Sequence, residues 1–277
     1  MKPMHFILTF IFGAALAGDA LAGSVISATG ASTIPSLASR GREITRSVYR
    51  IICPNGFGTG FLHKSGKVLT AYHVVQNCPN PIARSYAGQN FPLTVQAVDG
   101  DLDIAVLGST TPISGSPIPI ESGDNLEVGK EVATWGFPAG YPGDAPLLSV
   151  GYLSGQIDFQ TSQGSKFQQW VVNAAFNSGN SGGPLIDVDS GTVIGIVDSK
   201  LAPISPQAVS ALAALQQSPN GLIFQAVGPD GNPFNASEAQ VVAVVLDELR
   251  RQTQLVIGMA IRAQDIRNFL ASQNIDP

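Results

Sequence analysis

Short runs of apolar residues, separated by glycine, proline, asparagine and aspartate, follow one another from about position 45 to position 200. Runs of this length, rich in β-branched residues, predict strands joined by turns. We expect strands at 47–53, 58–63, 68–75, 91–99, 103–109, 131–137, 147–159, 168–175 and 192–199. The 30 glycines and 19 prolines among 277 residues favour an all-β protein over a helical bundle.

Helical spacing replaces this pattern after position 200. Residues 206–217 predict a helix, because proline suits the first helical position. Ser237 and Gln240 form a capping-box pattern in front of a second helix. We place that helix, a strand and a closing helix at 239–251, 255–261 and 263–270.

The first 22 residues predict a secretory signal. Lys2 supplies a basic start, residues 6–17 an apolar centre, and Ala20-Leu21-Ala22 a cleavage site. A membrane anchor is the alternative, but an apolar run of about 12 residues is shorter than the roughly 20 of a spanning helix. We therefore expect an exported chain, periplasmic or extracellular, without a stable membrane anchor. Residues 23–44 would form an N-terminal segment.

Charge and cysteine content narrow the possible functions. A net charge of −5 and a pI of about 5.1, with no cluster of Lys and Arg, argue against a nucleic-acid partner. Cys53 and Cys78 are the only cysteines, and in an exported chain they predict a disulfide. Closing a loop of about 26 residues would be worth roughly 3–4 kcal/mol in the chain-entropy model. We expect no metal site and no cofactor.

The segment GNSGGPL, residues 179–185, holds the strongest candidate for chemistry. A serine between glycines suits a tight turn in which the N–H groups of Gly179 and Ser181 converge on one point, as a developing oxyanion requires. A glycine-rich surface turn is the alternative. The Pro184-Leu185 pair and the strand that follows favour Ser181 as a nucleophile.

The order of the histidines decides which fold could use this serine. In α/β-hydrolases the histidine follows the serine, whereas His5, His63 and His73 all precede Ser181. His5 lies in the signal segment, and His63 adjoins a turn with two lysines that we expect to be solvated. His73 is therefore the candidate base, although a histidine on an apolar strand can also be a core residue.

An acid must hold the imidazole in one tautomer and stabilise the imidazolium. The segment DGDLDIAVL offers Asp99, Asp101 and Asp103. We prefer Asp103, because it directly precedes an apolar run and would start a buried strand. Asp101 is the second choice, and Asp99 is expected in a turn.

In this order, TAYHVV, DLDIAVL and GNSGGPL resemble the motifs of trypsin-like peptidases of the HtrA (Deg) type, within the chymotrypsin superfamily. The similarity covers roughly residues 45–200 and 255–270. It implies an all-β fold of two antiparallel six-stranded β-barrels, at 45–125 and 126–277, with a C-terminal helix. His73 and Asp103 would come from the first barrel and Ser181 from the second. The cysteine pair is similar to a bridge that braces the histidine loop in secreted members.

The resemblance also implies a substrate pocket with Ala175 at its base, six positions before Ser181. The implied walls are Asp198, Ser199, Lys200, Gly258, Met259 and Ala260. Because the base is not acidic, we expect small or medium aliphatic residues before the cleaved bond.

Three features depart from the family pattern. The chain stops at Pro277, so we expect no PDZ domain. Asn180 stands where zymogen-activated relatives have an aspartate, so activation by a freed N-terminus is not expected. Asn173 replaces an aspartate usual in HtrA proteins, a change we do not explain.

Residues 201–254 form a helical insertion before the last strand, which is longer than the loop of relatives. It is either a surface decoration or a cap that gates substrate entry. The whole sequence predicts a serine endopeptidase that acts on protein or peptide substrates through an acyl-enzyme. A non-catalytic binding module on the same fold and an esterase with the same triad are the alternatives. The sequence leaves the oligomeric state open.

Overall fold

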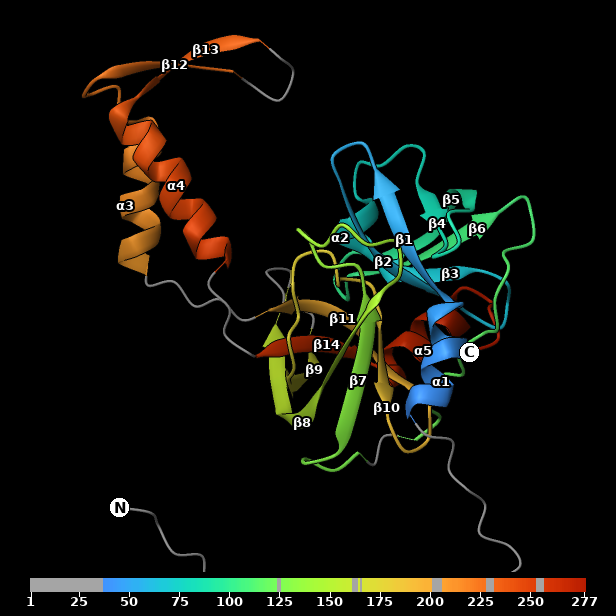
Figure 1. The fold of residues 1–277 in the computed structure, drawn as a ribbon. Coiled ribbons are helices and arrows are strands. Elements are labelled where there is room, and N and C mark those ends of the chain that lie inside the picture. The colour runs from blue at the N-terminus through green and yellow to red at the C-terminus, as the bar shows by residue number, and fades with distance from the viewer. Residues whose placement is uncertain are drawn as a thin grey trace, which may run out of the picture. The chain divides into compact units, whose positions relative to one another are not determined.

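The computed structural model describes residues 37–123, 126–160, 164, 166–200, 206–227, 232–252 and 257–277. The predicted signal segment and residues 23–36 lie outside this part. The described chain begins with α1 (Leu37–Thr45) and then enters the strands of two barrels (Figure 1).

The first barrel closes in the order β1-β2-β3-β6-β5-β4, with every pair antiparallel. Its strands are β1 (Val48–Cys53), β2 (Gly56–Leu62), β3 (Val68–Ala71), β4 (Ile82–Arg84), β5 (Asn90–Asp99) and β6 (Ile104–Ser109).

The second barrel closes in the order β10-β11-β14-β9-β8-β7, again with every pair antiparallel. Its strands are β7 (Glu131–Gly136), β8 (Leu147–Gln160), β9 (Lys166–Asn173), β10 (Pro184–Asp187), β11 (Val193–Lys200) and β14 (Gly258–Arg262). If its strands are counted from one to six along the chain, both barrels have the same order. Helix α5 (Ala263–Ser272) follows β14.

Each barrel has its own apolar core, and a third cluster joins the two. That joining cluster includes Phe61, Leu69 and Ile104 of the first barrel with Trp135, Ile186 and Ile261 of the second. Buried Ile266, Phe269 and Leu270 of α5 complete it, on the one face predicted for the closing helix. The two-barrel fold with its C-terminal helix is therefore confirmed.

The insertion contains α3 (Pro206–Gln217), β12 (Ile223–Val227), β13 (Pro233–Ser237) and α4 (Glu238–Gln252). The capping box is present: the Ser237 N–H donates to Gln240 Oε1 at 2.9 Å, and the Gln240 N–H donates to Ser237 Oγ at 3.2 Å. The hairpin β12–β13 was not predicted. Its Ile223 and Phe224 are exposed, as are Val244 and Leu249 of α4.

One predicted strand needs correction, and two further elements were not predicted. Residues 68–75 were expected to form one strand, but β3 ends at Ala71 and α2 (Tyr72–Val75) is a single helical turn. Helix α1 and strand β4 were not predicted. None of the described helices has the length and hydropathy needed to cross a bilayer.

Candidate active site

His73 is held twice by one carboxylate. It lies on α2, directly after β3, and its side chain is 46% exposed. Its backbone N–H donates to Asp103 Oδ1 at 2.7 Å, and its ring Nδ1 lies 2.5 Å from Asp103 Oδ2. A carboxylate bonded to Nδ1 leaves Nε2 as the ring nitrogen available for proton transfer.

Asp103 reaches this position through an unusual backbone conformation. Its φ of 59° is left-handed, a region that aspartate enters more readily than most residues. Upstream, Asp99 Oδ1 accepts the N–H groups of Asp101 and Leu102, so Asp99 holds the turn. The Asp103 carbonyl then accepts the Tyr72 N–H at 3.0 Å. The turn brings Asp103, among the three aspartates, against His73.

The turn that carries Ser181 depends on its glycines. Gly179 has a φ of +94°, and a Cβ there would lie 2.2 Å from the Phe137 carbonyl oxygen. Gly182 has a φ of +85°, and a Cβ there would lie 2.2 Å from both the Thr59 carbonyl oxygen and Thr70 Oγ1. A side chain at either position would be strained and would clash. The glycine spacing around Ser181 is therefore a steric requirement.

Thr59 of β2 ties this turn to the first barrel. The Thr59 N–H donates to the Ser181 carbonyl at 2.8 Å, and Thr59 Oγ1 donates to the Gly179 carbonyl at 2.6 Å. Thr59 is fully buried. With both carbonyls turned toward β2, the N–H groups of Gly179 and Ser181 have no protein acceptor among the described residues. Such free N–H donors are suited to an oxyanion.

A cavity of about 310 Å³ brings the predicted groups together. It is lined by His73, Phe176, Asn177, Ser178, Ser181, Val197 and Asp198. Ser181 Oγ donates to the Asp198 backbone carbonyl at 2.9 Å. In unliganded sites the nucleophile–base hydrogen bond is often formed only when substrate arrives.

The pKa values of the two described histidines are shifted in opposite directions. The hydrogen bond to Asp103 raises the pKa of His73 above 6.5, burial opposes this, and the charges of Asp103 and Asp198 add to the rise. His63 is 1% exposed, and burial lowers its pKa to about 4, helped by Lys64. Its Nδ1 lies 2.9 Å from Ser65 Oγ. The expectation that His63 is solvated is wrong, because its ring turns inward from the hairpin end.

Among the described residues, one group of three side chains has atoms of the types that can bind a metal ion. The donor atoms of His73, Asp103 and Asp198 lie within 4.8 Å of one another. The paired bonds between His73 and Asp103 favour proton transfer as the chemistry of this cluster.

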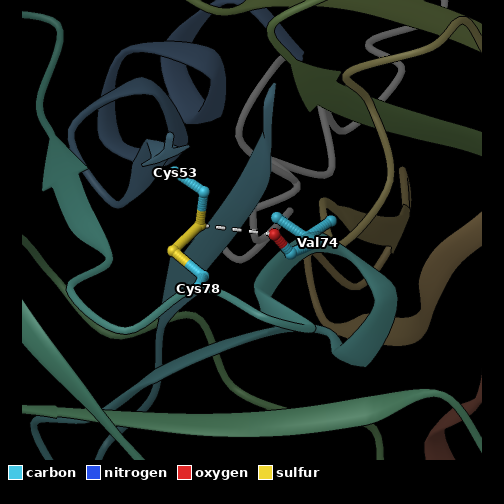
Figure 2. Close-up of a disulfide and its surroundings, with 3 residues drawn as sticks. All are labelled: Cys53, Val74 and Cys78. Atoms are coloured by element: carbon cyan, nitrogen blue, oxygen red, sulfur yellow. Dashed lines mark hydrogen bonds between the residues drawn. A yellow bond between two sulfur atoms is a disulfide. The ribbon is translucent and has the colours of Figure 1, made fainter. Parts of the chain in front are cut away.

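The predicted disulfide is present. Cys53 at the end of β1 is bonded to Cys78, after α2 (Figure 2). Cys53 Sγ also lies 3.4 Å from the Val74 carbonyl oxygen. Because a bridged sulfur has no hydrogen to donate, this is a packing contact. The bridge braces the segment that carries His73.

Residues 58–196, half of the chain, match the family model of the trypsin-like peptidase domain. The chain belongs to the trypsin-like peptidases. Its predicted resemblance to the HtrA (Deg) type is also confirmed by its relatives.

Two curated relatives of this trypsin-like peptidase are proteases by name. Protease Do-like 1 of Arabidopsis thaliana chloroplasts is 32% identical over 199 residues, covering 70% of this chain and 44% of that protein. A probable periplasmic serine endoprotease, DegP-like, of Chlamydia pneumoniae is 35% identical over 146 residues, covering 50% and 28%. This chain therefore spans less than half the length of either relative. These relatives support a serine-protease hydrolase.

A solved structure shows the same fold. The Rv3671c protease of M. tuberculosis in its active form has a TM-score of 0.58 to this chain and 19% identity. The match covers 86% of this chain and 85% of that one. At this identity the likeness concerns the fold alone.

The pocket of this trypsin-like peptidase differs in detail from the implied one. Phe176, which sequence reasoning missed, lines the cavity and is 4% exposed. A Cβ at Gly258 would lie 2.1 Å from the Phe176 ring, so the ring packs on the Gly258 backbone. Ala175 is half-buried beside it, and its N–H donates to Ser149 Oγ. The Phe176 ring therefore occupies the space against the Gly258 backbone.

The other implied wall residues are distributed differently. Ala260 is fully buried in the core of the second barrel, and Met259 is half-buried. Ser199 and Lys200 pair with Met259 and Gly258 through the backbone, and their side chains lie outside the described part. Asp198 does line the cavity, beside His73.

Asn180 stabilises the turn from within. It is 4% exposed, and its Nδ2 donates to the Ala175 carbonyl at 3.3 Å. This bond links the start of the 175–180 segment to its end. A neutral amide therefore makes a local bond at the position next to Ser181.

Proposed function

We propose that the protein is a serine endopeptidase in which Ser181 is the nucleophile, His73 the general base and Asp103 the acid that orients His73. The observation that carries this proposal is the pair of bonds from Asp103 to His73, facing the cavity that Ser181 also lines. The free N–H groups of Gly179 and Ser181 supply the third element that acyl transfer requires.

The reaction would proceed in two halves. Ser181 Oγ attacks the scissile carbonyl while its proton passes to His73 Nε2, and the N–H groups of Gly179 and Ser181 stabilise the oxyanion. His73 then gives this proton to the leaving amine as the C–N bond breaks. A water molecule, deprotonated by His73, then attacks the acyl-enzyme, and His73 returns this proton to Ser181 Oγ as the acyl C–O bond breaks.

One movement precedes this chemistry. The Ser181 hydroxyl donates to the Asp198 carbonyl in the structure. A rotation about the Cα–Cβ bond of Ser181 would release that bond and turn the hydroxyl toward His73. Staggered side-chain rotamers interconvert rapidly, so this rotation would not limit turnover.

The pocket supports a preference for small residues before the cleaved bond. The Phe176 ring fills space against Gly258, and the cavity beside Ser181 measures about 310 Å³. A peptide library should be cut after alanine, serine or valine, and Phe176→Val should admit larger aliphatic residues. Wild-type cleavage mainly after Arg, Lys or Phe would contradict the preference.

A labelling experiment tests the function. A fluorophosphonate probe should label the purified protein, and Ser181→Ala should lose both labelling and casein cleavage. Ser154→Ala is a matched control, because Ser154 is an exposed serine on β8 of the same barrel. Absence of wild-type labelling would favour the binding module. Labelling and ester hydrolysis without cleavage of peptides or casein would favour the esterase.

We also infer that the protein is exported. Residues 1–22 have a signal pattern, the Cys53–Cys78 bridge requires an oxidising compartment, and one relative is named as periplasmic. Intact-mass measurement of protein recovered from outside the cytoplasm should show cleavage after Ala22. Recovery of the full-length chain from the cytoplasm would contradict export.

A further inference from the structure

A second carboxyl group faces His73, and the mechanism above does not use it. The side chain of Asp198 near the end of β11 lies within 4.8 Å of the donor atoms of both His73 and Asp103. Asp198 therefore approaches the base from the second barrel, while Asp103 holds it from the first. Two carboxyl groups, those of Asp103 and Asp198, thus lie close to the imidazole of His73.

Asp198 is held in place by its own barrel. Gln169 Nε2 of β9 donates to Asp198 Oδ2 at 2.7 Å, and Gln169 is 2% exposed. The backbone carbonyl of Asp198 accepts the Ser181 hydroxyl. Both ends of the residue are thus fixed, and the carboxyl is directed to the region between the barrels.

The charges near Asp198 are few. Among the residues whose side chains the structure describes, its ionisable neighbours are His73 and Asp103, and Gln169 is neutral. The other cavity-lining residues, Phe176, Asn177, Ser178, Ser181 and Val197, carry no charge. Among the described ion pairs none includes Asp198. Within this described part of the chain, His73 is therefore the group whose positive charge Asp198 can offset.

We propose that Asp198 is a positioning residue that completes a two-carboxyl cradle around His73 and stabilises its imidazolium form during acyl transfer. The inference rests on the proposed function of His73 as the base. When Ser181 transfers its proton, the ring gains a positive charge, and each nearby carboxylate lowers the free energy of that state.

The electrostatics agree with this arrangement. Burial raises the pKa of Asp198, the Gln169 hydrogen bond opposes the rise, the charge of His73 lowers it, and both the charge of Asp103 and a side-chain hydrogen bond with Asp103 raise it further. Asp198 in turn raises the pKa of His73. His73 and Asp198 each shift the pKa of the other, so the acidic limb of the pH–rate profile belongs to this pair. Removing the Asp198 charge should let His73 lose its proton at lower pH.

Asp198→Asn is the decisive variant, because asparagine can still accept the Gln169 bond without a charge. The acidic limb of kcat/KM should move to lower pH, so that activity at about pH 6 rises several-fold relative to the plateau. Asp189→Asn is the matched control. It removes the same charge from the same barrel at a side chain that is 71% exposed, where solvent screening should leave the limb unmoved.

A second measurement does not depend on turnover. In a Ser181→Ala background, NMR titration of the His73 ring should show the same downward shift for Asp198→Asn, while His63 is unaffected. If Asp198→Asn fails to fold, Asp198→Ser serves, since it keeps a short polar side chain. An unmoved or upward-moving His73 titration would overturn the role of Asp198. Absence of fluorophosphonate labelling in the wild type would instead overturn the proposed function.

Discussion

The two barrels share one strand order, yet they present their chemistry in different ways. In each barrel the connection from the third strand to the fourth faces the cavity. In the first barrel it carries His73 on α2, and in the second it carries Ser181 on a glycine turn. Equivalent places in one topology therefore hold the proposed base and the proposed nucleophile.

The difference lies in what fixes each connection. The first is held from within its own barrel, by the Cys53–Cys78 bridge and by Asp103. The second has no covalent brace; it is held by hydrogen bonds to its own barrel, such as that from the Gly182 N–H to the Val197 carbonyl, and also by Thr59 of the other barrel. The proposed base is thus fixed within one barrel, whereas the turn that carries Ser181 takes part of its support from the other.

The largest expected effect comes from breaking the bond that fixes the base. Asp103→Asn should lower kcat by about 10⁴-fold, because an amide at this position favours the wrong tautomer of His73. Steady-state kinetics on a peptide ester and a peptide amide would measure it. Asp101→Asn makes the same change two residues away and should have little effect. Equal losses in the two variants would contradict the assignment of Asp103.

Removing the covalent brace should be the next largest effect. The double variant Cys53→Ser, Cys78→Ser should lower the free energy of unfolding by about 3.5 kcal/mol, given the separation of 25 residues between the cysteines. Urea unfolding followed by tryptophan fluorescence would measure it. The double variant should be insensitive to dithiothreitol, whereas the wild type should weaken. A loss below about 1 kcal/mol would show that the first barrel does not need the bridge.

The smallest expected effect is a fall in the free energy of unfolding at low pH, which should arise from His63 and not from His73. Since the pKa of His63 is about 4 in the fold and 6.5 unfolded, the unfolded chain binds more protons between these values. Stability should therefore fall as pH drops through this window, by about 3 kcal/mol in total for a ring that is 1% exposed. His63→Gln should remove this dependence, and His73→Gln should retain it. Chemical denaturation at pH 7, 5.5 and 4 would decide.

The contribution of His73 to stability has the opposite dependence on pH, because its pKa is raised in the fold. Its contribution to stability is complete below pH 6.5 and is lost as pH rises through the folded value. Proteolysis should increase over the same rise, because only the neutral ring accepts a proton from Ser181.

Patterns within a few residues of one another predicted much of the fold and of the candidate site. The capping box of Ser237 and Gln240 predicted where α4 starts, because both partners lie within four residues. The glycine spacing around Ser181 predicted the turn that carries it for the same reason. The strand predicted at 68–75 was wrong, because the chain turns into α2 after Ala71, where Tyr72 bonds to Asp103.

What could not be predicted depends on distant partners. Thr59 meets Gly179 across 120 positions, and no local pattern distinguishes it from any other strand threonine. Gln169 meets Asp198 across 29 positions in the same way. Phe176 could have been found, since it follows Ala175, the residue already placed at the pocket. His63 was misplaced because neighbouring lysines do not show which way a ring points.

Thr59 also makes the turn that carries Ser181 sensitive to the relative position of the two barrels. Its bonds hold the carbonyls of Gly179 and Ser181, so sliding one barrel over the other would strain the backbone next to the two N–H groups that we propose for the oxyanion. Activity would then depend on how closely the two barrels keep their relative position. A molecule that bound between the barrels and separated them would inhibit activity without contacting any of the proposed catalytic residues.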